Sequence, residues 1–390
     1  MVARNGARSF NERNRVVSVA QPKQSEVVFS VLLLTERDVR VAFALAGLGG
    51  LNAHGAGFLD TARAWGVAPD LVTATSGQIL VLSAWLQGLD LRQQLISADR
   101  LRDQTSQLRT LMFGYPGVFR PAYAEALARF VAWPDWRDGP FNVLADRLLP
   151  AQQYVPVRSE ADFAQAAATL NGTSIGVVFN TYDPESGTGL LYGNDAARAL
   201  LPSEKSIANT HAAQARQSAA KRDLRYASDV AAERALHPIT PEAIKAALWL
   251  SLYGFTRLPQ GQMDGAYHRA SIISELHGFD RVFAVRPLAN GWRGETPQNW
   301  FEVQDWTTEM WFSVGYKAEV DALKRINDLI AAGVITDPKY RRVDLVEIQP
   351  ETPAGYFNYF VERGEVYENA VIATELKFAE LGLVRPTEQA

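Results

Sequence analysis

The sequence predicts an α/β protein with three layers, in which a mostly parallel sheet carries helices on both faces. Short apolar runs alternate with helical patterns early in the chain, and this order is typical of parallel sheets covered by helices. The chain has 390 residues, of which 47% are apolar and 21% are charged. This is ordinary globular composition, so a chain of this length can bury a sizeable core.

The first four elements carry the clearest patterns. Residues 41–46 are an apolar run that ends in glycines, which predicts a strand followed by a tight loop. Residues 54–65 place apolar side chains on one face at helical spacing, which predicts a helix. A second strand is expected over 71–74 and a second helix over 79–86.

The later elements continue the same architecture. Residues 90–170 are predicted to be mainly helical, with prolines as punctuation. A pair of strands is expected on either side of the turn at 184–187. The remaining expected elements are strands at 282–285 and 343–348, and helices at 318–332 and 370–381.

The domain organisation follows from composition. Residues 1–37 read as a polar, basic arm with one short strand, and 38–390 as a single α/β domain. Residues 203–236 are polar and rich in alanine, and are either a lid or a solvated helical excursion, the second being favoured. No segment approaches the roughly 20 apolar residues that cross a bilayer, and no secretory signal is evident. We expect a cytoplasmic protein, with peripheral membrane contact and self-association left open.

Several function classes are disfavoured by residue content. The chain has no cysteine, which removes disulfides and thiolate chemistry. Its net charge of −4 gives no electrostatic case for binding nucleic acid. The five histidines never occur at the i, i+4 spacing of a helical zinc site, so neither a metal nor another cofactor is expected.

Two glycine-rich or small-residue turns follow the first two predicted strands. The loop Gly47-Leu48-Gly49-Gly50-Leu51-Asn52 is compatible with an oxyanion loop, a nucleotide-binding loop or a plain tight turn. Ser76, with its neighbours Gly77 and Gln78, lies at the second strand-to-helix junction, where a nucleophile elbow would place its serine. A helix N-cap explains the same serine. Far downstream, Asp264 precedes Gly265, which alone indicates only a turn.

In combination, these three motifs resemble those of the patatin-like phospholipases. That family has a glycine-rich oxyanion loop, then a Gly-x-Ser-x-Gly elbow, and far downstream an Asp-Gly-Gly or Asp-Gly-Ala motif. Here the loop at 47–52, the elbow at Ser76 and the segment Asp264-Gly265-Ala266 occur in that order. The resemblance covers about residues 38–290. It implies the three-layer fold of that family and hydrolysis of lipid or other carboxylic esters.

The resemblance also implies a mechanism and a site. Ser76 would be the nucleophile and Asp264 its base, forming a Ser–Asp dyad that works through an acyl-enzyme. The amides of Gly49 and Gly50, with Gly47 in the same loop, would form the oxyanion hole. An acyltransferase, a thioesterase, a nucleotide-binding enzyme and an inactive interaction scaffold remain as alternatives.

This chain departs from the family pattern at four positions. The loop lacks two glycines of the family, which are replaced by Leu48 and Asn52, and its basic residue, which is replaced by Leu51. Gln78 stands where the elbow usually has glycine, and we expect its side chain to turn over the sheet edge or into the pocket. The tryptophans between Trp292 and Trp311 form a separate aromatic cluster, which is compatible with core packing or with a lipid-facing rim.

Overall fold

The computed structural model describes residues 39–49, 51–96, 112–115, 117–133, 139–148, 150–201, 235–288, 291–292, 296–349 and 364–386. The expected arm at 1–37 lies outside these ranges, and so does 203–234 of the expected lid or excursion. Val39–Ala390 groups into one compact unit.

One mixed sheet organises the described residues, and its central strands are parallel. The strand order is β10-β9-β1-β2-β5-β6-β7, with β8 pairing to β5 beside this path. The pairs β10–β9, β9–β1, β1–β2 and β2–β5 are all parallel. The strands are β1 (Val41–Leu45), β2 (Leu71–Ala74), β5 (Gly176–Asp183), β6 (Thr188–Gly193), β7 (Leu236–His237), β8 (Met263–Asp264), β9 (Arg281–Val285) and β10 (Asp344–Ile348).

The central strand β1 is apolar at every position because both of its faces are covered. Phe43 and Leu45 of β1 belong to one buried cluster, whereas Ala42 and Ala44 belong to the cluster on the opposite face. Successive side chains of a strand point to opposite faces, so a continuous apolar run is what a doubly covered strand requires. The predicted three-layer α/β architecture is therefore confirmed.

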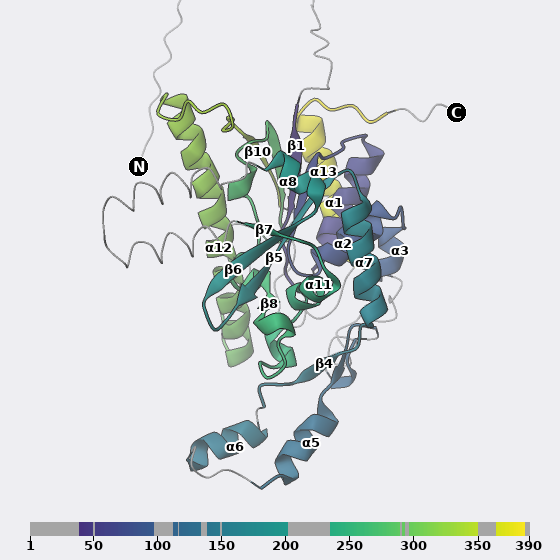
Figure 1. The fold of residues 1–390 in the computed structure, drawn as a ribbon, viewed down its shortest axis with the longest axis vertical. Helices are drawn as coiled ribbons and strands as arrows, with labels where there is room; N and C mark the ends of the chain where they lie inside the picture. Colours follow the sequence, from purple (N-terminus) through teal and green to yellow (C-terminus); the bar gives the residue numbers. More distant parts are fainter. Residues whose placement is uncertain are drawn as a thin grey trace, which may run out of the picture. The chain divides into compact units, whose positions relative to one another are not determined.

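Helices cover the two faces unequally (Figure 1). The long helix α12 packs on one face through Tyr316, Val320 and Leu323. Six helices, α1, α2, α3, α7, α11 and α13, contribute buried residues to the cluster on the other face. The helices are α1 (Ala53–Ala64), α2 (Gln78–Leu86), α3 (Leu91–Ile96), α7 (Glu160–Gly172), α8 (Asp195–Leu200), α11 (Pro241–Ala247), α12 (Trp300–Ala331) and α13 (Gly364–Glu380).

Helix α12 begins well before residue 318, where the sequence pattern placed its start. Asn299 caps it, because its side chain accepts a hydrogen bond from the Glu302 amide at 3.2 Å. Trp300, Trp306 and Trp311 consequently belong to this helix, whereas Trp292 precedes it. These three tryptophans are 64%, 44% and 52% exposed, and Tyr316, further along the helix, is buried.

A second, small sheet carries a pair of helices. Strands β3 (Phe119–Pro121) and β4 (Tyr154–Pro156) pair antiparallel. Between them in the chain come α5 (Tyr123–Val131) and α6 (Pro140–Leu148). No helix in the described ranges combines the length and apolarity that a bilayer span requires.

Candidate active site

Ser76 lies in the turn between β2 and α2, at the carboxyl end of the parallel strands. Its backbone φ is 57°, in the left-handed region that residues other than glycine seldom adopt. Holding a serine there costs about 1–2 kcal/mol. The residue is only 5% exposed. A strained strand-to-helix turn of this kind is the geometry that holds a nucleophilic hydroxyl clear of the sheet.

Gly47 and Gly77 permit this turn because neither has a side chain. Atoms of neighbouring residues lie where a Cβ at either position would be. A Cβ on Gly47 would lie 2.4 Å from the Thr75 carbonyl oxygen and 2.7 Å from Ser76 Cβ. A Cβ on Gly77 would lie 2.3 Å from Asn52 Nδ2. The glycine loop after β1 and the turn after β2 are therefore in direct backbone contact.

Asp264 reaches Ser76 from the far half of the chain. Strand β8 pairs antiparallel with β5, placing Asp264 opposite Thr181, and β5 is the neighbour of β2. The Ser76 hydroxyl donates a hydrogen bond to Asp264 Oδ2 across 188 positions of sequence. The other oxygen, Oδ1, accepts from the Ala266 amide at 2.8 Å. The structure thus brings together the two residues expected to form the dyad.

Burial raises the pKa of the Asp264 carboxyl group well above that of an ordinary aspartate. It is 2% exposed, and loss of solvation raises its pKa from 3.8 to about 7. The hydrogen bonds from Ser76 and from the Ala266 amide oppose this rise because they favour the ionised form. A carboxylate with a pKa near neutrality accepts a proton far more readily than an ordinary aspartate does.

Asn180 of β5 fixes the turn that follows Asp264. Its Nδ2 donates to the carbonyl oxygens of Gly265 at 3.1 Å and Arg269 at 2.9 Å. A Cβ on Gly265 would lie 2.3 Å from Asn180 Cγ, so the glycine after Asp264 makes room for the amide. Asn180 was not identified from the sequence. The sequence signal that could have identified Asn180 is its place as a polar residue directly after the apolar run of β5.

A partly buried ion-pair cluster anchors the same loop to α12. Arg269 Nη2 lies 2.6 Å from Glu275 Oε2 and 2.7 Å from Glu319 Oε2. Glu319 Oε2 also accepts the amides of Ile273 at 3.1 Å and Ser274 at 3.0 Å. Burial alone would lower the pKa of Arg269, but the two carboxylates raise it. No local sequence motif predicts this cluster, since its members are up to 50 positions apart.

The glycine loop is held in place by hydrogen bonds to neighbouring segments. The amide of Gly47 donates to the Ala270 carbonyl at 2.9 Å, so it is engaged in holding the loops together. Gly49 is half-buried with φ 46°, and its carbonyl accepts from Asn52 Nδ2 at 2.6 Å. Gly50 lies outside the described residues. Leu48 and Leu51 point into the core, at 4% and 1% exposure.

The Gln78 side chain does not enter a pocket or cross the sheet edge. It is fully buried beneath α1, where its Nε2 donates to the Asn52 carbonyl at 3.2 Å. A Cβ on Gly55 would lie 2.0 Å from Gln78 Oε1. Our expectation for this side chain was wrong, because the glycine on the facing helix provides a space that the sequence pattern did not reveal.

His54 is the histidine next to the glycine loop, and its surroundings keep it neutral. Burial lowers its pKa to about 4, while a hydrogen bond to the Leu51 carbonyl opposes the shift. Within the described ranges, no group of three histidine, aspartate or glutamate side chains is placed to hold a metal ion. The site is therefore built from Ser76, Asp264 and the loops that position them.

Comparisons with known proteins add little to this geometry. No protein-family model matches the sequence, and no curated protein is detectably similar to it. Among solved structures, the chain is similar to VipD from Legionella pneumophila with a TM-score of 0.35 and 10% identity. The match covers 88% of this chain and 67% of VipD. A likeness at this level carries no functional argument.

Proposed function

We propose that this protein hydrolyses lipid or other carboxylic esters, with Ser76 as nucleophile and Asp264 as its base. The observation that supports this most directly is the hydrogen bond from the Ser76 hydroxyl to a buried carboxylate. The serine occupies a strained turn at the carboxyl end of parallel strands. This combination of a base, a nucleophile and a turn that presents it is what acyl transfer requires.

The proposed first half-reaction forms an acyl-enzyme. Asp264 takes the proton of Ser76 as Oγ attacks the ester carbonyl carbon, giving a tetrahedral oxyanion. The carbon–oxygen bond to the alcohol then breaks, and Asp264 returns the proton to the departing alcohol. Backbone amides of the glycine loop, Gly49 and Gly50 in our assignment, would stabilise the oxyanion, each donor contributing roughly 3–4 kcal/mol.

The second half-reaction restores the enzyme. Asp264 takes a proton from a water molecule while the water oxygen attacks the acyl carbon. The proton then goes from Asp264 to Ser76 Oγ as the acid departs. The pKa of about 7 suits both directions of proton transfer, since a group near neutrality accepts and returns a proton with similar ease. An alcohol in place of water would make the same site an acyltransferase.

A fluorophosphonate probe tests this proposal on the full chain. We expect covalent labelling of Ser76, and loss of both labelling and short-chain aryl ester hydrolysis in Ser76→Ala. Ser271, a buried serine of the neighbouring loop at 1% exposure, provides the matched control. Ser271→Ala should label as the wild type does. A folded wild-type protein that neither labels nor hydrolyses the ester would support the scaffold alternative instead.

A further inference from the structure

Helices α5 and α6 expose an apolar surface that is out of place on a water-facing helix pair. Neither helix contains a buried residue. The large apolar side chains recur at i, i+4, i+7 and i+8 on α5 and at i, i+3 and i+7 on α6, a spacing that normally faces a core. Their exposures are Tyr123 61%, Leu127 63%, Phe130 53%, Val131 72%, Phe141 79%, Leu144 56% and Leu148 62%. Trp133, just past α5, is 90% exposed.

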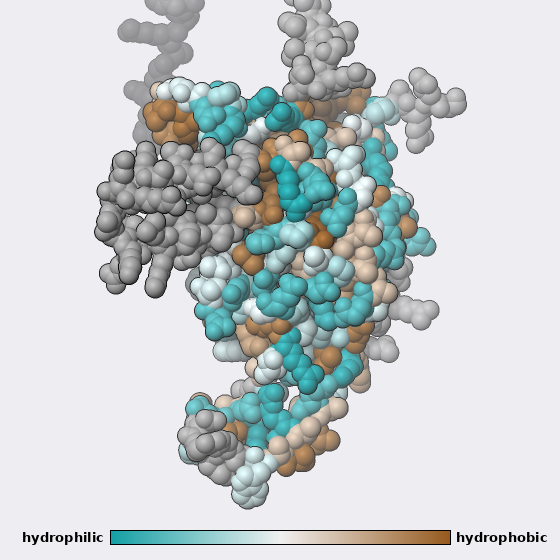
Figure 2. Space-filling view, in the orientation of Figure 1, coloured by the Kyte–Doolittle hydropathy of each residue, from teal (hydrophilic) through white to brown (hydrophobic). Residues whose placement is uncertain are grey.

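Polar contacts hold the two helices together and leave this apolar surface uncovered. Arg129 of α5 pairs with Asp146 of α6 at 3.1 Å. The Arg147 guanidinium lies 5.8 Å from the Phe130 ring centroid and donates to the Ala132 carbonyl. Figure 1 shows α5 and α6 as neighbours beyond β4, and Figure 2 shows apolar side chains gathered over α5. These contacts between the helices involve charged groups and the Phe130 ring, while Leu127, Phe141 and Leu144 stay exposed.

The net charge of the segment that carries α5 and α6 indicates which kind of partner could bind this surface. Residues 112–154 carry four arginines and four acids, so the segment has no net charge: Arg120, Arg129, Arg137, Arg147, Glu125, Asp135, Asp138 and Asp146. Glu125 is already paired with Arg120 at 2.8 Å, as Asp146 is with Arg129. Arginines and acids in equal number give the segment no attraction to a polyanion. Exposed aromatic and leucine side chains above such a set match a zwitterionic lipid surface.

The base of this helix pair is continuous with the candidate active site. Phe119 of β3 and Tyr154 of β4 belong to the same buried cluster as Trp249 and Met263. Met263 immediately precedes Asp264, whose amide donates to the Trp249 carbonyl at 3.0 Å. One packed unit thus links the apolar helix pair to the residue proposed as the base.

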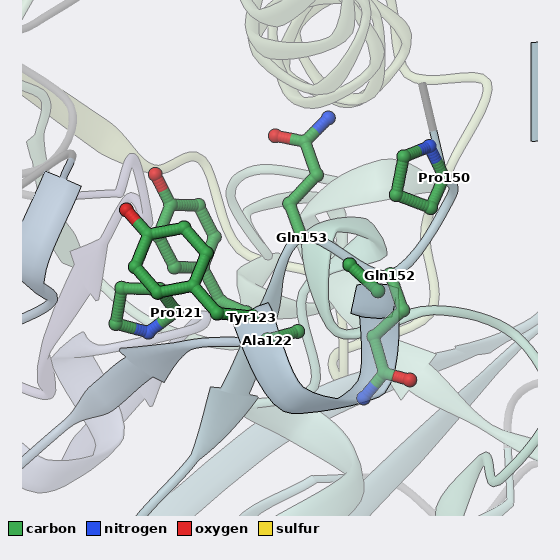
Figure 3. Close-up of a pocket in the computed structure, with 8 residues that line it drawn as sticks. Pro121, Ala122, Tyr123, Pro150, Gln152 and Gln153 are labelled. Carbon is green, nitrogen blue, oxygen red and sulfur yellow. The ribbon is translucent and has the colours of Figure 1, made fainter. Parts of the chain in front are cut away.

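A pocket lies where the helix pair joins the strands β3 and β4 (Figure 3). It has a volume of about 230 Å³, and neither member of the dyad lines it. Its walls come from the start of α5 and from the segment that returns into β4: Pro121, Ala122, Tyr123, Ala126, Pro150, Gln152, Gln153 and Tyr154.

We propose that α5 and α6 dock on a zwitterionic phospholipid surface through their exposed apolar side chains. This deepens the function proposed above, because it presents ester substrates at a lipid–water boundary beside the site. Binding itself does not depend on that function, and the two can be measured separately.

The experiment uses the full chain and vesicles of pure phosphatidylcholine. We expect the wild type to co-float with the vesicles at both low and high salt, because apolar contact rather than charge drives the association. Leu127→Asp with Phe141→Asp should lower the partition coefficient by roughly tenfold or more. Leu376 of α13, which is 62% exposed, is the matched control. Leu376→Asp should bind as the wild type does.

Turnover distinguishes this inference from the proposed function. In the Leu127→Asp, Phe141→Asp variant, hydrolysis of a dissolved short-chain ester should be unchanged while hydrolysis of a vesicle-borne ester falls. Absence of Ser76-dependent hydrolysis of either ester would refute the function but not the docking. Docking is refuted if the wild type does not bind vesicles, or if the double variant binds them equally well. A dimer in sedimentation that the double variant abolishes, without vesicle binding, would assign the face to a second copy.

Discussion

Gln78 and Gly55 complement each other across the α1–α2 contact. The glutamine fills the space that any side chain at position 55 would need, since a Cβ there would lie 2.0 Å from Gln78 Oε1. The elbow therefore tolerates a long residue two positions after Ser76, because the facing helix α1 has a glycine, Gly55, at the point of contact. The departure from the usual elbow glycine is a packing exchange and leaves the Ser76 turn intact.

Replacing Gln78 should consequently affect stability more than substrate choice. Gln78→Gly leaves a cavity under α1 and should lower the free energy of unfolding by about 2–4 kcal/mol. Chain-length selectivity on a series of esters should stay the same. Combining it with Gly55→Ala should recover part of the stability, as a double-mutant cycle would show. A changed selectivity profile would mean that this side chain contacts substrate.

The strain at Ser76 predicts opposite behaviour for two inactive variants. Ser76→Ala keeps a Cβ at φ 57°, whereas Ser76→Gly relieves the left-handed strain. Both should lose ester hydrolysis, but the glycine variant should be more stable than the alanine variant by about 1 kcal/mol. Chemical denaturation of the two proteins measures this difference. Equal stability would argue that the turn is not strained in solution.

The rate of hydrolysis should depend on ionisation of Asp264. Burial raises the pKa of this carboxyl to about 7, and only the ionised form accepts the serine proton. We expect kcat/KM to rise about tenfold per pH unit below pH 7 and to level off above it. His54 does not account for such a profile, since its pKa is lowered to about 4. His268 lies four residues after Asp264 and stacks on Tyr182. The profile should persist in His268→Gln; its disappearance there would assign the titration to that imidazole.

The same burial makes Asp264 costly to the fold once it is ionised. Its folded-state pKa of about 7 exceeds the unfolded value of 3.8, so the stability that it contributes below about pH 4 is lost as pH rises through 7. Asp264→Asn removes this loss. At pH 8 the variant should be inactive yet more stable than the wild type, by on the order of 3–4 kcal/mol. Near pH 4 the two should unfold alike, and a lower Tm for the variant at pH 8 would indicate a structural carboxylate.

The contact between Asn180 and Gly265 should be needed to align the dyad. A Cβ on Gly265 would meet Asn180 Cγ at 2.3 Å and its backbone carbon at 2.6 Å, so the turn must shift in Gly265→Ala. A displacement of about 1 Å between nucleophile and base costs on the order of a hundredfold in rate. Gly315 of α12 has open space around its Cβ position and serves as control. Full activity in Gly265→Ala would show that Asp264 does not need this turn.

The sequence predicted the elements that have strong local patterns and missed what depends on distant pairing. The strands at β1, β2, β9 and β10 were evident because each contains a short apolar run, which is continuous in β1, where both faces are covered. Ser76 and Asp264 were found because each lies in a short, ordered motif. Asn180 was missed, since its partners Gly265 and Arg269 are 85 and 89 positions away. The position of the Gln78 side chain depends on Gly55 in another helix, and no local sequence pattern predicts that contact.

The separation of Ser76 and Asp264 along the chain has a consequence for biosynthesis. A growing polypeptide leaves the ribosome with the amino-terminal half first, so the serine emerges and begins to fold long before its partner exists. Strand β9, which pairs with β1, is made later still. Until about two-thirds of the polypeptide has been made, a nascent chain therefore carries Ser76 without Asp264, and on the function proposed above translation itself delays assembly of the dyad.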